Sequence, residues 1–538
     1  MTVRSFIRNF KNYVTHYCSN ASIHGLKFLA EKDRSILERL WWLVFLTFAI
    51  FLCASSVLTT HAKWLNSPVI VSFATSETPI YQIPFPAITI CPLNKIESEQ
   101  LSINATGAET MKYASLICPK AMRYVYEYAE TVDEGALDFL LNISSDFEKD
   151  VWHCNMKQEY CNYDDYPNFV PTLSTDGVCF SFNSLDRSDL FTSETDLDYY
   201  DRLGIPHQPN SSWSTRYGYH LSAPLITYPR RAIATGASGG LNLILHSLKA
   251  KFDDLCGGVL DGYKIVIHHP SESPQYDQRY FLLPQNELVS VAVKPKMLRT
   301  SPEIQKYAAK DRKCFLDYER QLRFFKVYDQ QNCLSECLTN YSYAKCDCVG
   351  FYMPHSRGTP ICGPGSAECL RTAKNEFFIA DSELQLENYK KEVSLRMDSM
   401  SGVPRERKQF RKVAKPKCNC LPSCHSLSYD VETSQIKWNW HNDFKYSGET
   451  INSTTSGISR LRVYFKDWQF MSSERNELYG ESEFWANCGG LFGLFFGFSL
   501  MSVIEIVYYA TLRLCCNIRK FGFGGWSGAE TKEAKFSK

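Results

Sequence analysis

The sequence predicts a membrane protein in which two transmembrane helices flank one large, disulfide-rich extracellular domain of mixed α and β structure. Two mostly apolar runs predict the helices, namely Leu40–Leu58 and Phe484–Ile504. A helix needs ~20 apolar residues to cross the ~30 Å hydrocarbon core of a bilayer. Between the two runs lie roughly 425 residues that carry 16 of the 21 cysteines. Such a concentration of cysteines is typical of an oxidising compartment, where disulfides persist.

The charges beside the two runs set the predicted orientation. Residues 1–39 hold seven Lys and Arg against three acidic residues, and residues 513–538 hold six against two. Basic flanks stay in the cytoplasm, so both termini are placed inside and the first span serves as a signal anchor. The predicted division is a cytoplasmic N-terminal region (1–39), a first span (40–58), an extracellular domain (59–483), a pore-lining second span (484–512) and a cytoplasmic tail (513–538).

The composition argues against several classes of protein. The 59 Lys and Arg nearly balance the 58 Asp and Glu, so no overall field favours nucleic acid. The basic run Arg405–Lys417 is interpreted as a solvated helix end. Gly236–Gly240 has the spacing of a nucleophile elbow, but a strand-like segment follows it where that motif needs a helix. His268–His269 is expected at the surface. We therefore predict no catalytic residue, metal or cofactor.

Periodicity in the extracellular domain predicts both strands and helices. Apolar and polar residues alternate in the predicted strands, and a longer period marks the helices. The predicted strands are Val69–Phe73, Phe85–Ile90, Leu241–Leu248, Tyr263–His268 and Tyr280–Val293, and the predicted helices are Arg312–Tyr341 and Asp381–Met400.

The cysteine spacing in the second half of this domain predicts a ladder of disulfides. Cys333 and Cys337 share one face of a helix, ~6 Å apart along its axis. Cys418 and Cys420 share one face of an extended strand, ~6.6 Å apart. Because the separations match, Cys333–Cys420 and Cys337–Cys418 form two rungs between antiparallel segments, and Cys314–Cys424 closes a third.

The remaining cysteines of the domain are expected to pair as well. Cys346, Cys348, Cys362 and Cys369 would nest inside the ladder as two more bridges, although Cys-x-Cys spacing also suits zinc. The other expected pairs are Cys154–Cys161, Cys91–Cys179 and Cys118–Cys256. Asn-x-Ser/Thr acceptors in the domain predict glycosylation at Asn104, Asn142, Asn210, Asn340 and Asn452.

The second apolar run contains regularly spaced glycines and polar residues that a simple membrane anchor does not need. Gly489, Gly493 and Gly497 recur every four residues, a spacing that lets helices pack closely. Polar groups that lipid would reject interrupt the same run: Asn487, Ser499, Ser502 and Glu505. Intramembrane polar residues usually face a bundle interior or a water-filled path. We therefore favour a pore-lining helix over a dimer anchor, with a backbone broken at Gly497–Ser499 that offers carbonyls to an ion.

Several motifs together resemble the degenerin/epithelial sodium channel family, in particular its arthropod pickpocket branch, over essentially the whole chain. They are His24-Gly25 before the first span, Phe85–Cys91 after it, the Tyr328, Cys333, Cys337, Cys346 and Cys348 series, and Gly497-Phe498-Ser499 in the second span. The resemblance implies a trimer whose extracellular domain is a clenched hand of palm, ball, finger, thumb and knuckle. The nested disulfides are then Cys346–Cys369 and Cys348–Cys362.

The resemblance also implies a function. The chain would be a subunit of an amiloride-sensitive, sodium-selective, voltage-independent channel, with sodium as permeant ion, amiloride as blocker and related subunits in a homo- or heterotrimer. It would lie in the plasma membrane of sensory or epithelial cells, in contact with lipid. Gly497, Phe498 and Ser499 would form the selectivity filter, and the pore and gating residues would be His24, Gly25, Ala486, Asn487, Gly493 and Glu505. Ala486 falls where bulky replacements hold such channels open.

Some positions depart from the family pattern, and other protein classes share the topology. Phe498 is bulky where acid-sensing members carry Ala, Asn487 replaces a pore-mouth carboxylate, and Ile70 and Val71 stand near the place of a palm histidine pair, so proton gating is not expected. The alternatives are a non-conducting two-span glycosylated receptor, an obligate accessory subunit and an ATP-gated trimeric channel. The pore-like face of the second span argues against a receptor.

Overall fold

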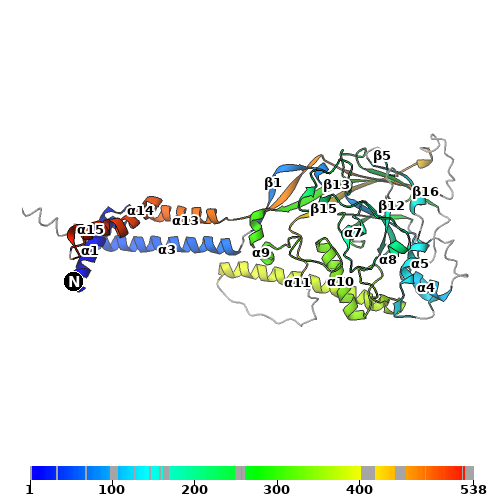
Figure 1. Ribbon diagram of the computed structural model, residues 1–538, viewed down its shortest axis with the longest axis horizontal. Helices are drawn as coiled ribbons and strands as arrows, with labels where there is room; N and C mark the ends of the chain where they lie inside the picture. The colour runs from blue at the N-terminus through cyan, green and yellow to red at the C-terminus, as the bar shows by residue number, and fades with distance from the viewer. Residues whose placement is uncertain are drawn as a thin grey trace, which may run out of the picture. The chain divides into compact units, whose positions relative to one another are not determined.

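The computed structural model describes residues 3–31, 34–66, 69–96, 107–125, 128–144, 147–156, 159–161, 169–248, 256, 261–274, 276–401, 418–442, 456–478, 480–523 and 525–527. The chain forms two compact units, drawn in Figure 1. The helical unit comprises residues 1–70, 301–307 and 476–538, and the β-rich unit comprises residues 71–300 and 308–475. The expected glycosylation sites Asn104 and Asn452 and the basic run Arg405–Lys417 lie outside the described residues.

The helical unit contains both apolar runs. Its elements are α1 (Val3–Asn20), α2 (Leu26–Ala30), α3 (Ile36–Asn66), a 3₁₀ turn (Pro302–Lys306), α13 (Glu481–Phe496), α14 (Leu500–Tyr508), a π-helical turn (Tyr509–Arg513) and α15 (Leu514–Phe521). Two helical stretches, Ile36–Trp64 and Leu500–Phe521, are long and apolar enough to cross a membrane, and only 6% and 11% of their apolar windows are buried. Side chains this apolar and this exposed need another apolar phase, as a bilayer provides.

The β-rich unit is built mainly from strands joined by short helices. Its strands are β1 (Val69–Pro79), β2 (Ala87–Pro92), β3 (Thr131–Val132), β4 (Val151–Met156), β5 (Glu159–Tyr160), β6 (Phe169–Ser174), β7 (Gly177–Phe182), β8 (Trp213–Ser214), β9 (Gly218–Tyr219), β10 (Leu241–Leu248), β11 (Gly262–His268), β12 (Tyr280–Pro284), β13 (Glu287–Thr300), β14 (Ile361–Cys362), β15 (Ser426–Lys437), β16 (Ser456–Phe465) and β17 (Gln469–Glu477). Its helices are α4 (Ala108–Ala114), α5 (Gly135–Ile143), α6 (Phe147–Asp150), α7 (Arg187–Leu190), α8 (Asp198–Arg202), α9 (Ala309–Arg312), α10 (Gln330–Cys346) and α11 (Ala367–Ser401), with 3₁₀ turns at Ile80–Gln82, Pro119–Tyr124 and Pro364–Ser366.

Two sheets share one apolar core in this unit. The larger runs in the order β1-β17-β13-β16-β10-β4-β5, with β15 also paired to β13, and the smaller runs β12-β11-β2-β7-β6. Alternate residues of β13 point into the core, where Val289, Val291 and Val293 are at most 1% exposed. This two-residue alternation is what a strand with one buried face requires, and it confirms the mixed α and β fold predicted for the domain.

Several predicted elements have different bounds: the strand predicted at Val69–Phe73 extends to Pro79, and the helix predicted at Asp381–Met400 begins at Ala367. Two further differences have a local cause. The predicted helix Arg312–Tyr341 begins only at Gln330, because the side chain of Asp329 accepts the Gln331 N–H at 2.7 Å and caps α10 there. The predicted strand Tyr280–Val293 is two strands that belong to different sheets, β12 and β13, and the chain turns between them at Asn286, which has a left-handed φ of 61°.

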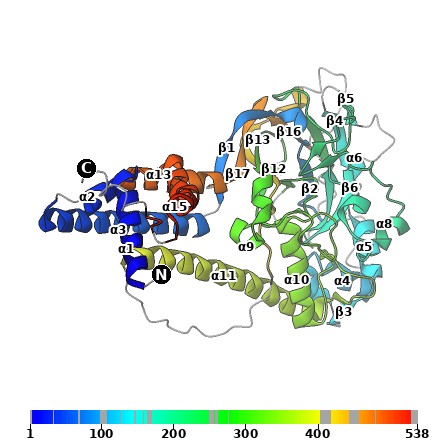
Figure 2. The same cartoon turned by 60° about the vertical axis from the view of Figure 1, so that its left-hand side comes forward.

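Eight disulfides staple the β-rich unit, and they coincide with the expected pairs. They are Cys91–Cys179, Cys118–Cys256, Cys154–Cys161, Cys314–Cys424, Cys333–Cys420, Cys337–Cys418, Cys346–Cys369 and Cys348–Cys362. Helix α10 lies beside α11 in both views (Figure 1, Figure 2). The partner of α10 in the ladder, Cys418–Cys420, is held to the helix by two disulfides and by the Gln330 amide, which donates to the Cys420 carbonyl at 3.0 Å.

Candidate functional site

The second apolar run is interrupted in its middle, as the sequence predicted. Helix α13 ends at Phe496, and Gly497 adopts a left-handed φ of 61°. The Gly497 N–H donates to the Gly493 carbonyl at 2.8 Å, which closes the end of the helix. Ser499 then caps α14, its own N–H donating to Ser502 Oγ at 3.2 Å. The carbonyls of Gly497 and Phe498 therefore lie outside both helices.

The segment between α1 and α2 packs directly against this interruption. The His24 N–H donates to the Phe496 carbonyl at 2.9 Å, and His24 Nδ1 lies 3.1 Å from the same oxygen. The imidazole occupies the space beside Gly497, where any added Cβ would overlap it. Gly25 has a φ of 89°, a conformation that glycine adopts readily. His24, Gly25 and Gly497, chosen separately from the sequence, thus meet in one place.

A second contact joins the same segment to α14. The Ser22 N–H donates to Glu505 Oε2 at 3.0 Å, and the hydroxyls of Ser22 and Ser502 share a hydrogen bond of 2.8 Å. Ser502 is fully buried. The N-terminal segment therefore supplies a hydrogen-bond donor to the Glu505 carboxylate, an acid placed in an apolar helix.

Sequence reasoning missed the role of the N-terminal helix. Tyr17 and Tyr13 of α1 lie with their ring centroids 5.2 and 6.3 Å from that of Tyr509, in the π-helical turn after α14. Asn9 and Ser527 hydrogen-bond near the end of the described chain. The signal was present, since Tyr13 and Tyr17 are four residues apart and share one helix face.

The other predicted pore residues lie apart from this contact. Ala486 and Asn487 are exposed on α13, and ten or eleven residues separate them from Gly497, ~15 Å along a helix. Near the same end of α13, the rings of Trp64 and Phe484 stack at 5.0 Å where α3 and α13 run side by side (Figure 1). Gly493 lies one turn before the interruption. The helical unit thus presents two levels, an exposed one at Ala486–Asn487 and a packed one at Gly497–Glu505.

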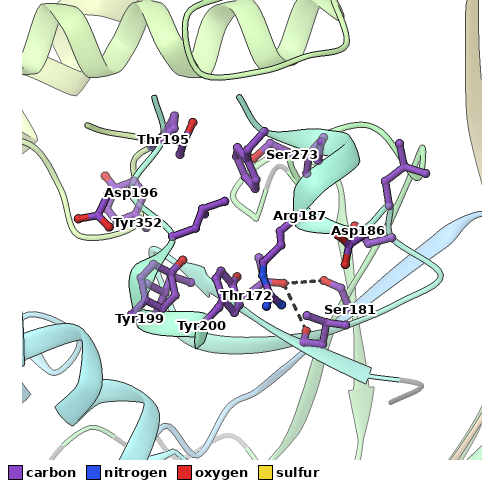
Figure 3. A pocket seen from close by; sticks show the side chains of 18 of the residues that line it. Thr172, Ser181, Asp186, Arg187, Thr195, Asp196, Tyr199, Tyr200, Ser273 and Tyr352 are labelled. Carbon is purple, nitrogen blue, oxygen red and sulfur yellow. Dashed lines mark hydrogen bonds between the residues drawn. The ribbon is translucent and has the colours of Figure 1, made fainter. Parts of the chain in front are cut away.

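The β-rich unit contains a pocket that several hydroxyl groups line (Figure 3). It encloses about 960 Å³ of empty space, including its open side, among β6, β7, α7, α8 and residues 351–355. Arg187 is fixed by Asp201 at 2.8 Å and lies over the Tyr200 ring. The hydroxyls of Thr172 and Ser181 are 3.1 Å apart.

The hydroxyl groups of this pocket are not arranged for nucleophilic catalysis. Ser181 reaches His268 only through the Thr89 hydroxyl, with 2.8 Å at each step, and the other nitrogen of His268 faces the His269 carbonyl at 2.9 Å. A nucleophile needs a base within direct hydrogen-bond reach and a group that orients that base. Among the described residues, no group of three or more His, Cys, Asp or Glu is placed to hold a metal ion.

The prediction that His268–His269 lies at the surface is wrong. Both side chains are 6% exposed, and His269 Nδ1 shares a hydrogen bond with the Ser271 hydroxyl at 2.7 Å. Burial lowers the pKa of His268 to about 4 and that of His269 to about 3. Both rings are therefore neutral at physiological pH, and the pair packs against β2 and the 271–274 turn.

The expected glycosylation sites Asn142, Asn210 and Asn340 are exposed.

Next to this pair, a carboxyl group should make stability depend on pH. Burial, and secondarily the Asp329 carboxylate, raises the pKa of Glu272 from 4.5 to about 7. The folded protein therefore binds this proton more tightly than the unfolded chain does. Its stabilising contribution is complete below pH 4.5 and is lost as the pH rises through 7. Glu272→Gln, which mimics the protonated group, should be more stable than the wild type by less than ~1 kcal/mol at pH 5 and by about 3 kcal/mol at pH 8.

Thermal unfolding of the solubilised full chain at both pH values measures this difference. Glu194→Gln is the control, since Glu194 is an exposed carboxylate paired with Arg323 at 2.8 Å. An equal shift in melting temperature at pH 5 and pH 8 for Glu272→Gln would contradict the assignment.

Comparison with known proteins gives matches over nearly the whole chain. Residues 17–509 match the family described as "Amiloride-sensitive sodium channel". "Pickpocket protein 28" of Drosophila melanogaster is 28% identical over 95% of this chain and 80% of its own length. "Sodium channel protein Nach" of Drosophila melanogaster is 23% identical over 96% and 90%. "Acid-sensing ion channel 1A" of Danio rerio is 22% identical over 94% and 90%.

Proposed function

Because the chain belongs to the amiloride-sensitive sodium channel family, we propose that it is a subunit of an amiloride-sensitive, sodium-selective and voltage-independent channel of the plasma membrane. This family consists of membrane-embedded ion channels and not of enzymes, which agrees with the absence of a catalytic residue among our sequence predictions. The subunit assembles as a trimer with copies of itself or with related subunits, in sensory or epithelial cells. Both of its termini are cytoplasmic.

One observation carries the proposal, namely the interruption of the second apolar helix at Gly497–Ser499. Backbone that leaves a helix at membrane depth is tolerated where it is buried in protein or lines a water-filled path. Carbonyls released from the helix ladder can replace part of an ion's hydration shell. The Gly497 and Phe498 carbonyls and the Ser499 hydroxyl supply such oxygen ligands, and repetition of this segment around a threefold axis would make a ring of them.

The contacts around the interruption support a gating role for the N-terminal segment. His24 binds the carbonyl of Phe496, the residue that precedes the filter segment, and Ser22 binds Glu505 beyond it. A movement of α1 and α2 would therefore change the hydrogen bonds on both sides of Gly497–Ser499. Ala486 and Asn487, exposed on α13, would face the extracellular part of the pore.

The test uses whole-cell current from cells that express Ala486→Val, with surface labelling in parallel. The exposed Ala486 side chain leaves α13 free to pack against neighbouring subunits, and a β-branched residue there would hinder that packing and hold the pore open. We expect a standing inward current that disappears when sodium is replaced by N-methyl-glucamine and that amiloride blocks. This design does not require the natural stimulus to be known.

A second variant tests the filter itself. In the Ala486→Val background, Ser499→Leu should abolish the current or shift its reversal potential, whereas Ser55→Leu, which changes an exposed serine of α3, should leave both unchanged. Unchanged currents in Ser499→Leu would contradict the filter assignment. Surface protein without current in Ala486→Val, even with related subunits co-expressed, would favour a non-conducting receptor, whereas current only upon co-expression would identify an obligate partner.

A further inference from the structure

The five cysteines outside the disulfides are not equivalent. Cys53 and Cys488 are 2% and 4% exposed within the helical unit, and Cys18 is half-buried. Cys515 and Cys516, adjacent at the start of α15, are both exposed. All cysteines of the β-rich unit are paired in disulfides. Cys515 and Cys516 are therefore the most accessible thiols among the described residues.

The pair lies where the exposed surface changes from apolar to basic. Leu512 is 59% exposed on the preceding turn, and Arg519 is exposed one turn later. Residues three, four and seven positions apart share a helix face, so Leu512, Cys515, Cys516 and Arg519 form one exposed stripe. Such a change at the end of a membrane-spanning helix marks the level of the lipid headgroups.

The opposite side of this region is already occupied. Asn517 is 7% exposed and Trp526 is 9% exposed. The Trp526 ring lies 5.5 Å from that of Tyr13, and Ser527 hydrogen-bonds Asn9 of α1. Helix α1 therefore contacts the turn after α15, whereas the two thiols of α15 remain exposed.

We propose that Cys515 and Cys516 form an S-acylation site that takes long-chain fatty acyl groups from an acyl-CoA thioester. In each transfer, Sγ attacks the thioester carbonyl, a new carbon–sulfur bond forms, and the bond from that carbonyl to the coenzyme A sulfur breaks. The proton of the cysteine thiol ends on the departing coenzyme A thiol, and nothing is oxidised or reduced. Juxtamembrane cysteines are the usual acceptors of this modification.

The surroundings suit both the donor and the product. Arg513, Arg519 and Lys520 lie within about one turn of the thiols, and their positive charges favour the phosphates of the acyl donor and anionic headgroups. The attached acyl chain would lie along the apolar surface to which the exposed Leu512 belongs. Two acyl chains anchor far more firmly than one, so the pair would fix α15, and with it the α1 contacts, at the membrane surface.

Acyl exchange on the full chain expressed in cultured insect cells tests the proposal. Free thiols are blocked with N-ethylmaleimide, thioesters are cleaved with hydroxylamine, and the released thiols are tagged with maleimide-polyethylene glycol. We expect two mass steps that depend on hydroxylamine, one step in Cys515→Ser or Cys516→Ser, and none in the double variant. Cys18→Ser, which removes the half-buried thiol of α1, is the matched control and should keep both steps.

Two results would overturn the proposal. One is a wild-type chain with no hydroxylamine-dependent step, and the other is a double variant that keeps its steps. The inference rests on the proposed function only through the cytoplasmic placement of α15, and the assay needs no current. A chain that conducts sodium without thioesters would contradict this site alone, whereas an acylated chain that never conducts would contradict the channel alone.

Discussion

Replacing Gly497 by alanine is expected to reduce the sodium current of the Ala486→Val form by about tenfold or more without reducing the amount of protein at the cell surface. Gly497 has a φ of 61°, and an L-residue pays roughly 1–2 kcal/mol for a left-handed conformation. The added Cβ would also overlap the His24 imidazole. The substitution therefore forces either the helix end or His24 to move, and 1.4 kcal/mol already corresponds to about a tenfold change in an equilibrium constant.

A matched control separates this local effect from a general intolerance of alanine in α13. Gly490 lies on the same helix, has no atom within 4 Å of an added Cβ and no left-handed φ. Gly490→Ala should retain most of the current. If Gly497→Ala conducts as well as Gly490→Ala does, the contact between His24 and Gly497 has no part in conduction.

A double variant distinguishes the two causes of the Gly497→Ala defect. Adding His24→Ala removes the overlap with the imidazole and leaves the backbone cost in place. Partial recovery of current in Gly497→Ala with His24→Ala, relative to each single variant, would assign the recovered part to the steric contact. If His24→Ala alone conducts, no recovery in the double variant would assign the whole effect to the left-handed backbone of Gly497.

Removing the disulfide Cys314–Cys424 should have a large effect on stability. Both cysteines are completely buried, and they are 110 residues apart in the sequence. Because the Cys333–Cys420 rung lies inside this span, the loop that Cys314–Cys424 closes is only about 24 residues long, and in the loop-entropy description it stabilises the folded state by about 3 kcal/mol. Backbone hydrogen bonds beside it, from the Phe315 N–H to the Pro422 carbonyl and from the Cys424 N–H to the Phe315 carbonyl, join the same two segments and would open with it.

The double variant Cys314→Ala with Cys424→Ala is therefore expected to lose about tenfold or more of its mature surface protein, because unfolded chains are removed in the cell. Surface biotinylation and thermal unfolding measure the loss. The control is Cys346→Ala with Cys369→Ala, whose disulfide joins half-buried residues and should contribute less, because the nested Cys348–Cys362 disulfide leaves it a loop of only about ten residues. Equal losses in the two double variants would show that loop length and burial do not set the effect.

The sequence alone was sufficient for the spanning helices, for two rungs of the disulfide ladder and for the break in the second span. Apolar runs of fixed length indicated the spanning helices, and the spacing of Cys333 and Cys337 against Cys418 and Cys420 indicated two rungs of the ladder. Both follow from the rise per residue of a helix or an extended chain. The glycine and serine at positions 497 and 499 likewise indicated a broken helix, because glycine ends helices in a left-handed conformation and serine begins them.

The contacts that give these features a role were decided by the tertiary structure. His24 meets Phe496 across more than 470 residues, and Ser22 meets Glu505 across 483. The histidine pair expected at the surface is buried. Glu272 lies close enough to Asp329 for the negative charge of Asp329 to raise the pKa of Glu272. No local periodicity encodes such meetings, because they depend on how whole helices and sheets pack. Composition and spacing set which groups are present, whereas packing sets which of them touch and how far water is excluded from them.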